Sequence, residues 1–240
     1  MPTSRKVDLS PVSLRRRPVT RLAQLLVGLV LYGTSMAAQV RSGLGLNPWD
    51  VLHQGLAPRL GWSFGAVTAL TGVLVLLVWI PLRQRPGVGT VANVVVIAFA
   101  VDAALGLIPA ATALPWRIGL MVGGVLLNGI ATACYVGSRL GPGPRDGLMT
   151  GLHARTGWSV RWVRTGIELT VLAVGWLLGG TVGIGTVLYA AAIGPLTQFF
   201  LRWMVYREAV AEPVKPVGSV KPVGPVGPVG SVGGPCPATD

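Results

Sequence analysis

Long apolar stretches, separated by short polar or charged segments, dominate the chain between residues 21 and 205. A helix needs roughly 20 mostly apolar residues to cross a bilayer, and most of these stretches have about that length. The longest run, Thr165–Leu201, is divided by Gly179-Gly180-Thr181, because such a segment favours a turn. The pattern therefore predicts an all-α polytopic membrane protein with six spanning helices, at residues 22–40, 60–82, 88–108, 118–138, 160–178 and 183–203.

The first apolar stretch also fits a second interpretation. Basic residues precede it, and Ser35-Met36-Ala37 lies near its end, which is typical of a cleaved signal peptide. However, the repeat described next copies this stretch into the body of the chain, and a leader would have no reason to be copied. We therefore expect it to be a helix of the folded protein.

The chain matches itself at an offset of 96 residues without a gap, with 28 identities over the 82 positions 21–102. The shared patterns include Pro-x-Asp (48–50 and 144–146) and Gly-Trp-Ser (61–63 and 157–159). A common membrane composition does not explain such local patterns, so we infer an internal duplication. The copies are expected at residues 21–109 and 117–205. Since each holds three spans, they would be inverted relative to one another.

The charges agree with this arrangement. The chain carries 20 Lys and Arg against 8 Asp and Glu, and only 12% of its residues are charged. Basic residues concentrate in alternate segments, whereas the segments between them hold only Arg41, Arg59 and Arg117. Cytoplasmic loops are rich in Lys and Arg, so both termini are predicted to be cytoplasmic, with attraction to the anionic inner leaflet. No basic motif interleaved with aromatic residues indicates nucleic-acid binding.

Between the first and second spans of each copy lies a segment that begins with glycines and Pro-x-Asp. Proline suits the first turn of a helix, and an aspartate there meets unpaired backbone N–H groups and the positive end of the helix dipole. The sequence predicts two short helices at 48–58 and 144–154, too short to span. Each could line a polar cavity as a half-helix, or lie at the interface with Asp50 and Asp146 acting only as caps.

Polar residues within apolar spans are candidates for a substrate or ion pathway, because they are costly in a bilayer. Each also has a structural interpretation. Glu168 could pair with Arg164 four residues earlier, and Asp102 could reach water. Asn93, Asn128 and Gln39 could bond across helices. The predicted pathway residues are Asp50, Asp146, Asn47, Gln54, Asn93, Asp102, Glu168 and Gln198.

We find no pattern that predicts catalysis, a metal site or a cofactor. His53 and His153 do not correspond in the repeat and form no metal-ligand spacing. No nucleophile–base pattern and no usefully spaced pair of carboxylates is present. Gly-x-Gly-Thr, at 87–90 and 183–186, lacks the glycine and lysine spacing of nucleotide loops, and close packing of helices is the simpler interpretation.

The two ends of the chain differ from its apolar body. Residues 1–20 are basic and polar, and we expect a cytoplasmic arm there. From residue 206 the chain leads into repeats of Pro, Val and Gly, a composition typical of an extended, disordered tail.

Two segments of the first copy resemble a known family. Residues 45–56, Gly-Leu-Asn-Pro-Trp-Asp-Val-Leu-His-Gln-Gly-Leu, and residues 79–90, Trp-Ile-Pro-Leu-Arg-Gln-Arg-Pro-Gly-Val-Gly-Thr, are similar to the YczE branch of the YczE/YyaS/YitT membrane proteins. The resemblance covers about residues 21–205. It implies a multi-pass protein of the bacterial plasma membrane, and it carries over no catalytic or ligand-binding residues.

These observations favour a small transporter or permease for an ion or small solute, with Asp50 and Asp146 at the two mouths of a pathway between the copies. The alternative is a membrane scaffold or accessory protein that transports nothing. A polar cavity among the helices favours transport, whereas a solid apolar interior favours the scaffold.

Overall fold

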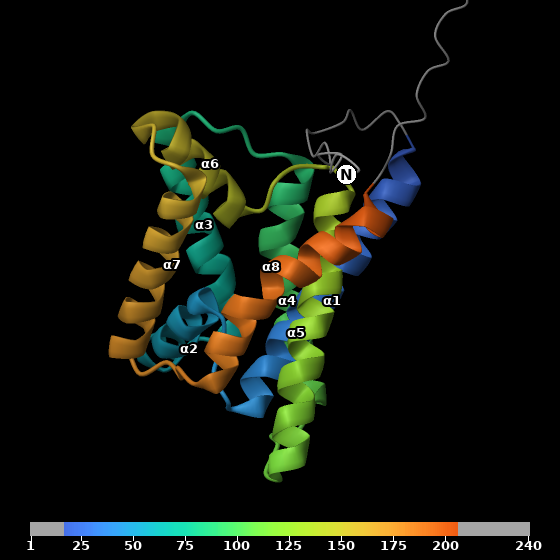
Figure 1. Ribbon diagram of the computed structural model, residues 1–240, viewed down its shortest axis with the longest axis vertical. Coiled ribbons are helices and arrows are strands. Elements are labelled where there is room, and N and C mark those ends of the chain that lie inside the picture. The colour runs from blue at the N-terminus through green and yellow to red at the C-terminus, as the bar shows by residue number, and fades with distance from the viewer. Residues whose placement is uncertain (1–16, 206–240) are drawn as a thin grey trace, which may run out of the picture. The chain divides into compact units, whose positions relative to one another are not determined.

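The computed structural model describes residues 17–205, which form eight α-helices and no β-strand (Figure 1). Most of the predicted basic arm and the whole Pro-Val-Gly tail lie outside the described residues. The helices are α1 (Pro18–Ser42), α2 (Pro48–Leu60), α3 (Phe64–Leu82), α4 (Val88–Leu107), α5 (Leu114–Gly137), α6 (Pro144–Thr156), α7 (Val160–Leu177) and α8 (Ile184–Met204).

Helix boundaries follow capping residues that are visible in the sequence. The Asn47 side chain accepts a hydrogen bond from the backbone N–H of Asp50 at the start of α2, as expected of an N-cap. Ser63 caps α3 in the same way, through the N–H of Ala66. This cap shortens the span predicted at 60–82, because α3 begins only at Phe64 and Leu60 belongs to the end of α2.

Five of the eight helices, α1, α3, α4, α5 and α8, are long and apolar enough to cross a membrane. Helix α7 occupies the position of the predicted fifth span, but its 18 residues include Arg161, Arg164 and Glu168 and it is not among these five. Helices α2 and α6 have 13 residues each. At 1.5 Å per residue each is roughly 20 Å long, too short to span.

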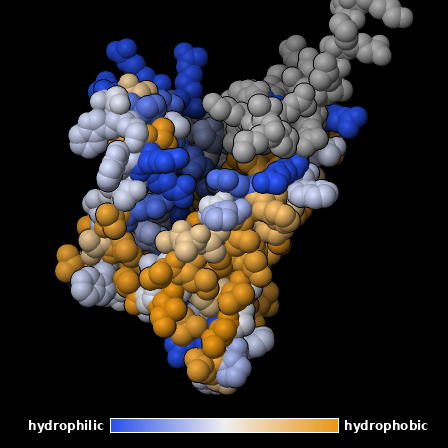
Figure 2. Space-filling model, viewed as in Figure 1, coloured by the Kyte–Doolittle hydropathy of each residue, from blue (hydrophilic) through white to orange (hydrophobic). Residues whose placement is uncertain are grey.

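The outer surface of the long helices is apolar. Large side chains such as Leu77, Ile80, Phe99 and Leu107 are exposed, and Figure 2 shows hydrophobic residues over much of the visible face. A continuous apolar surface of this kind promotes aggregation in water, whereas it suits the acyl chains of a bilayer. The exterior therefore supports a multi-pass membrane protein.

Helix α1 packs along both α5 and α4, α5 also packs on α8, and α3 packs on α4 and α6. The core between them contains the fully buried side chains of Leu25, Leu29, Met36 and Val101. Helices α1 and α5 run in opposite directions (Figure 1). Figure 1 also shows α2 and α6 at opposite ends of the helices, which we call the α2 end and the α6 end.

The close approach of α1 to α5 depends on a glycine. A Cβ atom at Gly28 would lie 2.7 Å from the backbone nitrogen of Tyr135, closer than packed atoms can approach. Small residues that let two backbones meet are typical of helix pairs in membranes.

The duplication seen in the sequence is also visible in the helices. Each helix of the second copy begins 96 positions after its equivalent in the first. The first copy's helices begin at Pro18, Pro48, Phe64 and Val88, and those of the second copy begin at Leu114, Pro144, Val160 and Ile184. Moreover, contacts between the copies are reciprocal. The Nε atom of Arg21 donates to the carbonyl of Ser138 at 2.9 Å, and the equivalent Arg117 donates to the equivalent Ser42 at 2.8 Å.

The Gly-x-Gly-Thr segments show the same reciprocity. The N–H of Gly89 donates to the carbonyl of Leu140 at 3.0 Å, and the N–H of Gly185 donates to that of Leu44 at 2.9 Å. A surface that contacts its own equivalent in this way is characteristic of a twofold relation. These segments therefore mediate close packing between the copies.

The two copies differ in one respect. Helix α3 packs against α4, but their equivalents α7 and α8 are not packed together in this way. Helix α7 packs mainly on α2 instead. The space between α7 and α8 leads to the site described next.

Candidate functional site

A cavity of about 820 Å³ lies between the two copies. Figure 2 shows hydrophilic side chains gathered in the hollow between α7 and α8. Both copies contribute to its wall, which includes Tyr32, Asn47, Trp49, Arg85, Asn93, Tyr135, Arg139, Arg145, Asp146, Arg164, Glu168, Tyr189 and Gln198. The cavity extends to the α6 end, because Gln84 and Arg85, from the segment that joins α3 to α4, also line it.

The N-terminus of α2 presents a buried carboxylate beside this cavity. Asp50 is fully buried. Its backbone N–H donates to Asn47 Oδ1 at 3.0 Å, and its Oδ2 accepts from Asn47 Nδ2 at 2.5 Å. The N-cap and the helix dipole thus hold this charge at the first turn of α2.

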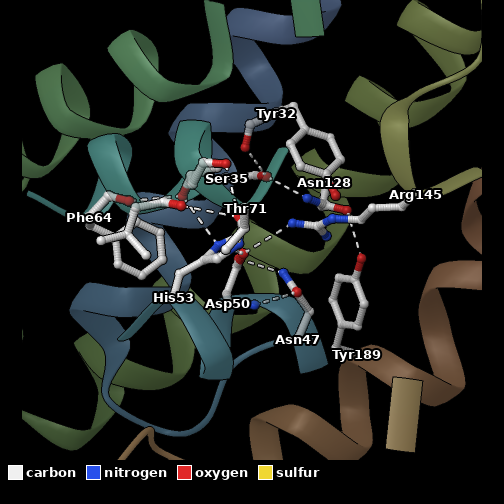
Figure 3. A network of polar contacts seen from close by, with 12 residues as sticks. Tyr32, Ser35, Asn47, Asp50, His53, Phe64, Thr71, Asn128, Arg145 and Tyr189 are labelled. Carbon is white, nitrogen blue, oxygen red and sulfur yellow. Dashed lines mark hydrogen bonds and ion pairs between the residues drawn. The ribbon is translucent and has the colours of Figure 1, made fainter. Parts of the chain in front are cut away.

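Arg145, in the first turn of α6, reaches toward this carboxylate from the other copy (Figure 3). Its terminal nitrogen lies 3.8 Å from Asp50 Oδ1, and its guanidinium carbon lies 4.8 Å from the centre of the Trp49 ring. An arginine over an aromatic face is stabilised by a cation–π interaction. Arg145 and Trp49 are equivalent positions in the duplication, so the first turns of the two short helices meet here.

Behind Asp50 lies His53, one turn further along α2. Its Nδ1 is 3.3 Å from Asp50 Oδ1 and 3.2 Å from the Thr68 hydroxyl, and its Nε2 is 2.7 Å from the Thr71 hydroxyl. Burial lowers the pKa of His53 below its ordinary value of 6.5, because desolvation disfavours the imidazolium. The ring is therefore neutral at pH 7, and the two threonine hydroxyls hold it beside the carboxylate.

The start of α6 is built differently from that of α2. Its N-cap, Gly143, has no side chain with which to bond the first N–H groups. Asp146 faces the cavity and accepts a hydrogen bond from the Tyr135 hydroxyl at 3.4 Å. Burial raises the pKa of Asp146, and the nearby Arg164 and Arg145 oppose that increase.

A chain of hydrogen bonds joins three helices beside the cavity. The Asn128 amide donates to the Ser35 hydroxyl at 2.8 Å, and the Tyr189 hydroxyl donates to Asn128 Oδ1 at 3.2 Å. These contacts confirm the prediction that Asn128 bonds across helices, and they fix Tyr189 in the wall (Figure 3).

The structure brings most of the predicted pathway residues together. Asn47, Asn93, Asp146, Glu168 and Gln198 line the cavity, and Asp50 lies behind Arg145. Glu168 accepts a hydrogen bond from Arg164 at 2.9 Å, which confirms the predicted ion pair within α7.

Two of the predicted pathway residues lie elsewhere, because they cap backbone groups. Gln54 Oε1 accepts from the N–H of Thr181 at 2.7 Å, in the segment between α7 and α8. Asp102 accepts from the Ser63 hydroxyl at 2.6 Å and from the N–H of Gly65 at 2.7 Å, at the start of α3. Neither is part of the cavity wall.

Arg145 and Trp49 are the main residues that sequence reasoning missed. The signal was present, because Trp49 is replaced by Arg145 at the equivalent position of the second copy. Nothing in the sequence, however, shows that the two side chains meet. Within residues 17–205, no three His, Cys, Asp or Glu side chains are grouped to hold a metal ion.

Spanning-length helices with an apolar exterior, packed around a cavity that has charged side chains in its wall, define a multi-pass α-helical membrane protein. Comparison with known proteins agrees with this class. The chain belongs to a family described as a family of unknown function (DUF6198), which matches residues 19–202. No solved structure shows significant similarity to the chain.

Three relatives illustrate this membership. An uncharacterized protein of Haemophilus influenzae is 44% identical over 74% of this chain and 81% of its own length. The uncharacterized membrane protein YczE of Bacillus subtilis is 34% identical over 78% of this chain and 88% of its own length. The uncharacterized protein YyaS of the same bacterium is 24% identical over 73% and 89%. The resemblance to the YczE branch is thereby confirmed.

Proposed function

We propose that the protein is a small transporter or permease, which moves a small solute or ion through the cavity between its two copies. The observation that carries this proposal is the cavity itself. It is large enough for an organic molecule, and charged side chains from both copies are part of its wall. A scaffold has no need of such a site, because burying charge in a membrane protein is costly.

The proposal includes six spans arranged as an inverted repeat. It is supported by the opposite directions of α1 and α5 (Figure 1) and by the reciprocal bonds of Arg21 and Arg117. In this scheme α7 is the fifth span along the chain, in addition to the five helices α1, α3, α4, α5 and α8. Its 18 residues would extend roughly 27 Å, close to the thickness of the hydrocarbon core. Glu168 and Arg164 neutralise each other and face the cavity.

Charge sets the proposed orientation. The start of α1, the α3–α4 and α5–α6 segments and the end of α8 share the α6 end (Figure 1). These segments hold most of the basic residues, whereas the other end holds Arg41, Arg59 and Arg117. Under the positive-inside rule, the α6 end faces the cytoplasm of a bacterial cell. The cavity then opens inward in the described conformation, and the buried Asp50 closes its outer end.

Transport requires that the cavity also open to the other side. In an inverted repeat the two copies can exchange conformations, and this exchange moves the opening from one side to the other. The first turns of α2 and α6 meet at Trp49, Asp50 and Arg145, so this contact is the proposed point of rearrangement.

Cysteine labelling tests this proposal without knowledge of the solute. Asn93, in the cavity wall, is replaced by cysteine in a chain whose two native cysteines are serine. A membrane-impermeant maleimide should label Asn93→Cys in both inside-out and right-side-out vesicles. Arg155→Cys, on the exposed part of α6, is the control and should react from the cytoplasmic side alone.

Labelling of Asn93→Cys from one side only, under conditions where Arg155→Cys reacts fully, would overturn alternating access. That result would favour the alternative function, a membrane scaffold or accessory protein.

A further inference from the structure

We infer that the cavity binds a small organic anion, whose carboxylate or phosphate group lies at the Arg145 guanidinium in place of Asp50. The inference rests on the proposed function only in that both use the same cavity. It names the class of solute and the residue that recognises it.

The charges in the wall favour an anion. Four arginines line the cavity, Arg85, Arg139, Arg145 and Arg164, against the two carboxylates of Asp146 and Glu168. Glu168 is already paired with Arg164 at 2.9 Å.

Arg145 is the arginine best placed to accept a new partner. Its nitrogen approaches Asp50 Oδ1 only to 3.8 Å, which is longer than a hydrogen bond. A quarter of its side chain is exposed, so it remains accessible from the cavity. The Trp49 ring contacts the flat face of the guanidinium, so the N–H edge of the guanidinium is not covered by this ring. That edge binds carboxylates and phosphates with two parallel hydrogen bonds.

An unpartnered buried polar atom at the same place also indicates a ligand. The indole Nε1 of Trp49 is buried and has no hydrogen-bond partner. Buried polar groups are almost always paired, and an indole N–H can only donate. An anion at Arg145 would supply the missing acceptor for Trp49. The start of α6, whose Gly143 cap lacks a side chain, adds the positive end of its dipole.

The remainder of the cavity indicates an organic molecule rather than a bare ion. At about 820 Å³ the cavity lies within the range of small-molecule sites. Apolar side chains, including Val94, Ile97 and Ile193, form part of its wall. They suit an apolar body attached to the charged group.

The direct test measures equilibrium binding to the purified full-length protein in detergent by titration calorimetry. Benzoate and phenyl phosphate are the probes, and benzamide is the neutral control of similar shape. The inference expects both anions to bind at least tenfold more tightly than benzamide. It would be overturned if benzamide bound equally well.

Variants identify the recognising residue. Arg145→Ala should weaken benzoate binding at least tenfold, whereas Arg155→Ala, on the same helix but outside the cavity wall, should leave it unchanged. Asp50→Asn should tighten binding several-fold, because it removes the carboxylate that competes for Arg145. If Arg145→Ala does not fold, the tighter benzoate binding expected of Asp50→Asn still tests the inference. Unchanged binding in Asp50→Asn would contradict the exchange of partners.

The anion could be free in solution or belong to a lipid, since the space between α7 and α8 faces the bilayer. Nanodiscs with and without phosphatidylglycerol distinguish the two sources. Retention of this lipid by the native protein but not by Arg145→Ala would support the inference with a lipid as the source, and benzoate binding that is independent of lipid composition would support a soluble anion.

These results are separable from the test of transport. Anion binding with one-sided labelling of Asn93→Cys would overturn the transport proposal alone. Two-sided labelling without anion binding would overturn the anion inference alone.

Discussion

At the scale of single residues, the site depends on a difference between two equivalent positions. Trp49 and Arg145 derive from the same position of the duplicated unit, and in the folded protein one stacks on the other. Two tryptophans would have left Asp50 without a cation from the other copy, and two arginines would have repelled each other. Because the two residues differ, their contact is a cation–π interaction that also brings a cation near Asp50.

The charge of Asp50 has a consequence for transport. After an anion leaves, Arg145 needs the Asp50 carboxylate as its partner, because an uncompensated charge in a buried site is costly. We predict that Asp50→Asn, although it binds benzoate more tightly, reduces benzoate counterflow in proteoliposomes to the level of protein-free vesicles. Asp102→Asn, the same exchange outside the cavity, should retain flux. Native rates in Asp50→Asn would remove this residue from the mechanism.

The contact of α1 with α5 also depends on one residue. In Gly28→Ala the new Cβ would lie 2.7 Å from the backbone of Tyr135, so the two helices must separate. Overpacking of this kind costs about 1–3 kcal/mol, and thermal unfolding in detergent should show a lower Tm. Gly123→Ala in α5 is the matched control, because its Cβ would meet nothing within 4 Å, and a helical alanine is favoured over glycine.

At the scale of elements, the two short helices differ in how they begin. Helix α2 has the side-chain cap of Asn47, whereas α6 starts from Gly143 without one. The capped end holds a buried carboxylate of the protein itself. The other end has no side-chain cap, and the positive end of its dipole adjoins the cavity, whose wall includes Asp146.

The cap of α2 can be tested by substitution. Asn47→Ala removes the acceptor for the N–H of Asp50 and the donor to its carboxylate, and loss of an N-cap costs about 1 kcal/mol. We expect a lower Tm and weaker closure of the outer end. Asn47→Ser, which keeps an N-cap acceptor, should recover most of the stability. Equal Tm values for Asn47→Ala and the native protein would show that the cap contributes nothing.

At the scale of the whole molecule, duplication accounts for both the packing and the cavity. Reciprocal hydrogen bonds join α1 to α5 at both ends, so these two helices form a well-packed interface between the copies. Helix α7 lies against α2 rather than α8, and of its residues only Val163 and Gly175 are buried. This difference between the copies places the cavity beside α7.

The inverted arrangement makes a topological prediction. Reporters inserted after Arg59 and after Arg155, equivalent positions of the two copies, should lie on opposite sides of the membrane. A reporter active only in the periplasm should be active after Arg59, and one active only in the cytoplasm should be active after Arg155. Finding both on the same side would rule out inversion.

The helices could be predicted from the sequence because their determinants are local. Apolar runs, prolines and caps set the length and start of each helix, and the short helices at Pro48 and Pro144 follow from Pro-x-Asp alone. The roles of Gln54 and Asp102 could not be predicted in this way. Each accepts a hydrogen bond from a backbone N–H of another helix or connecting segment, and local sequence does not specify which segment lies nearby.

The sequence by itself determined a membrane protein of duplicated helices, because hydrophobic length, charge bias and repeated motifs act through neighbouring residues or through the bilayer as solvent. Only the tertiary structure decided that Trp49, Asp50 and Arg145 meet beside a cavity, and that α7 does not pack on α8. These contacts join positions almost a hundred residues apart. Their energy exists only once the helices pack, so no local pattern encodes them.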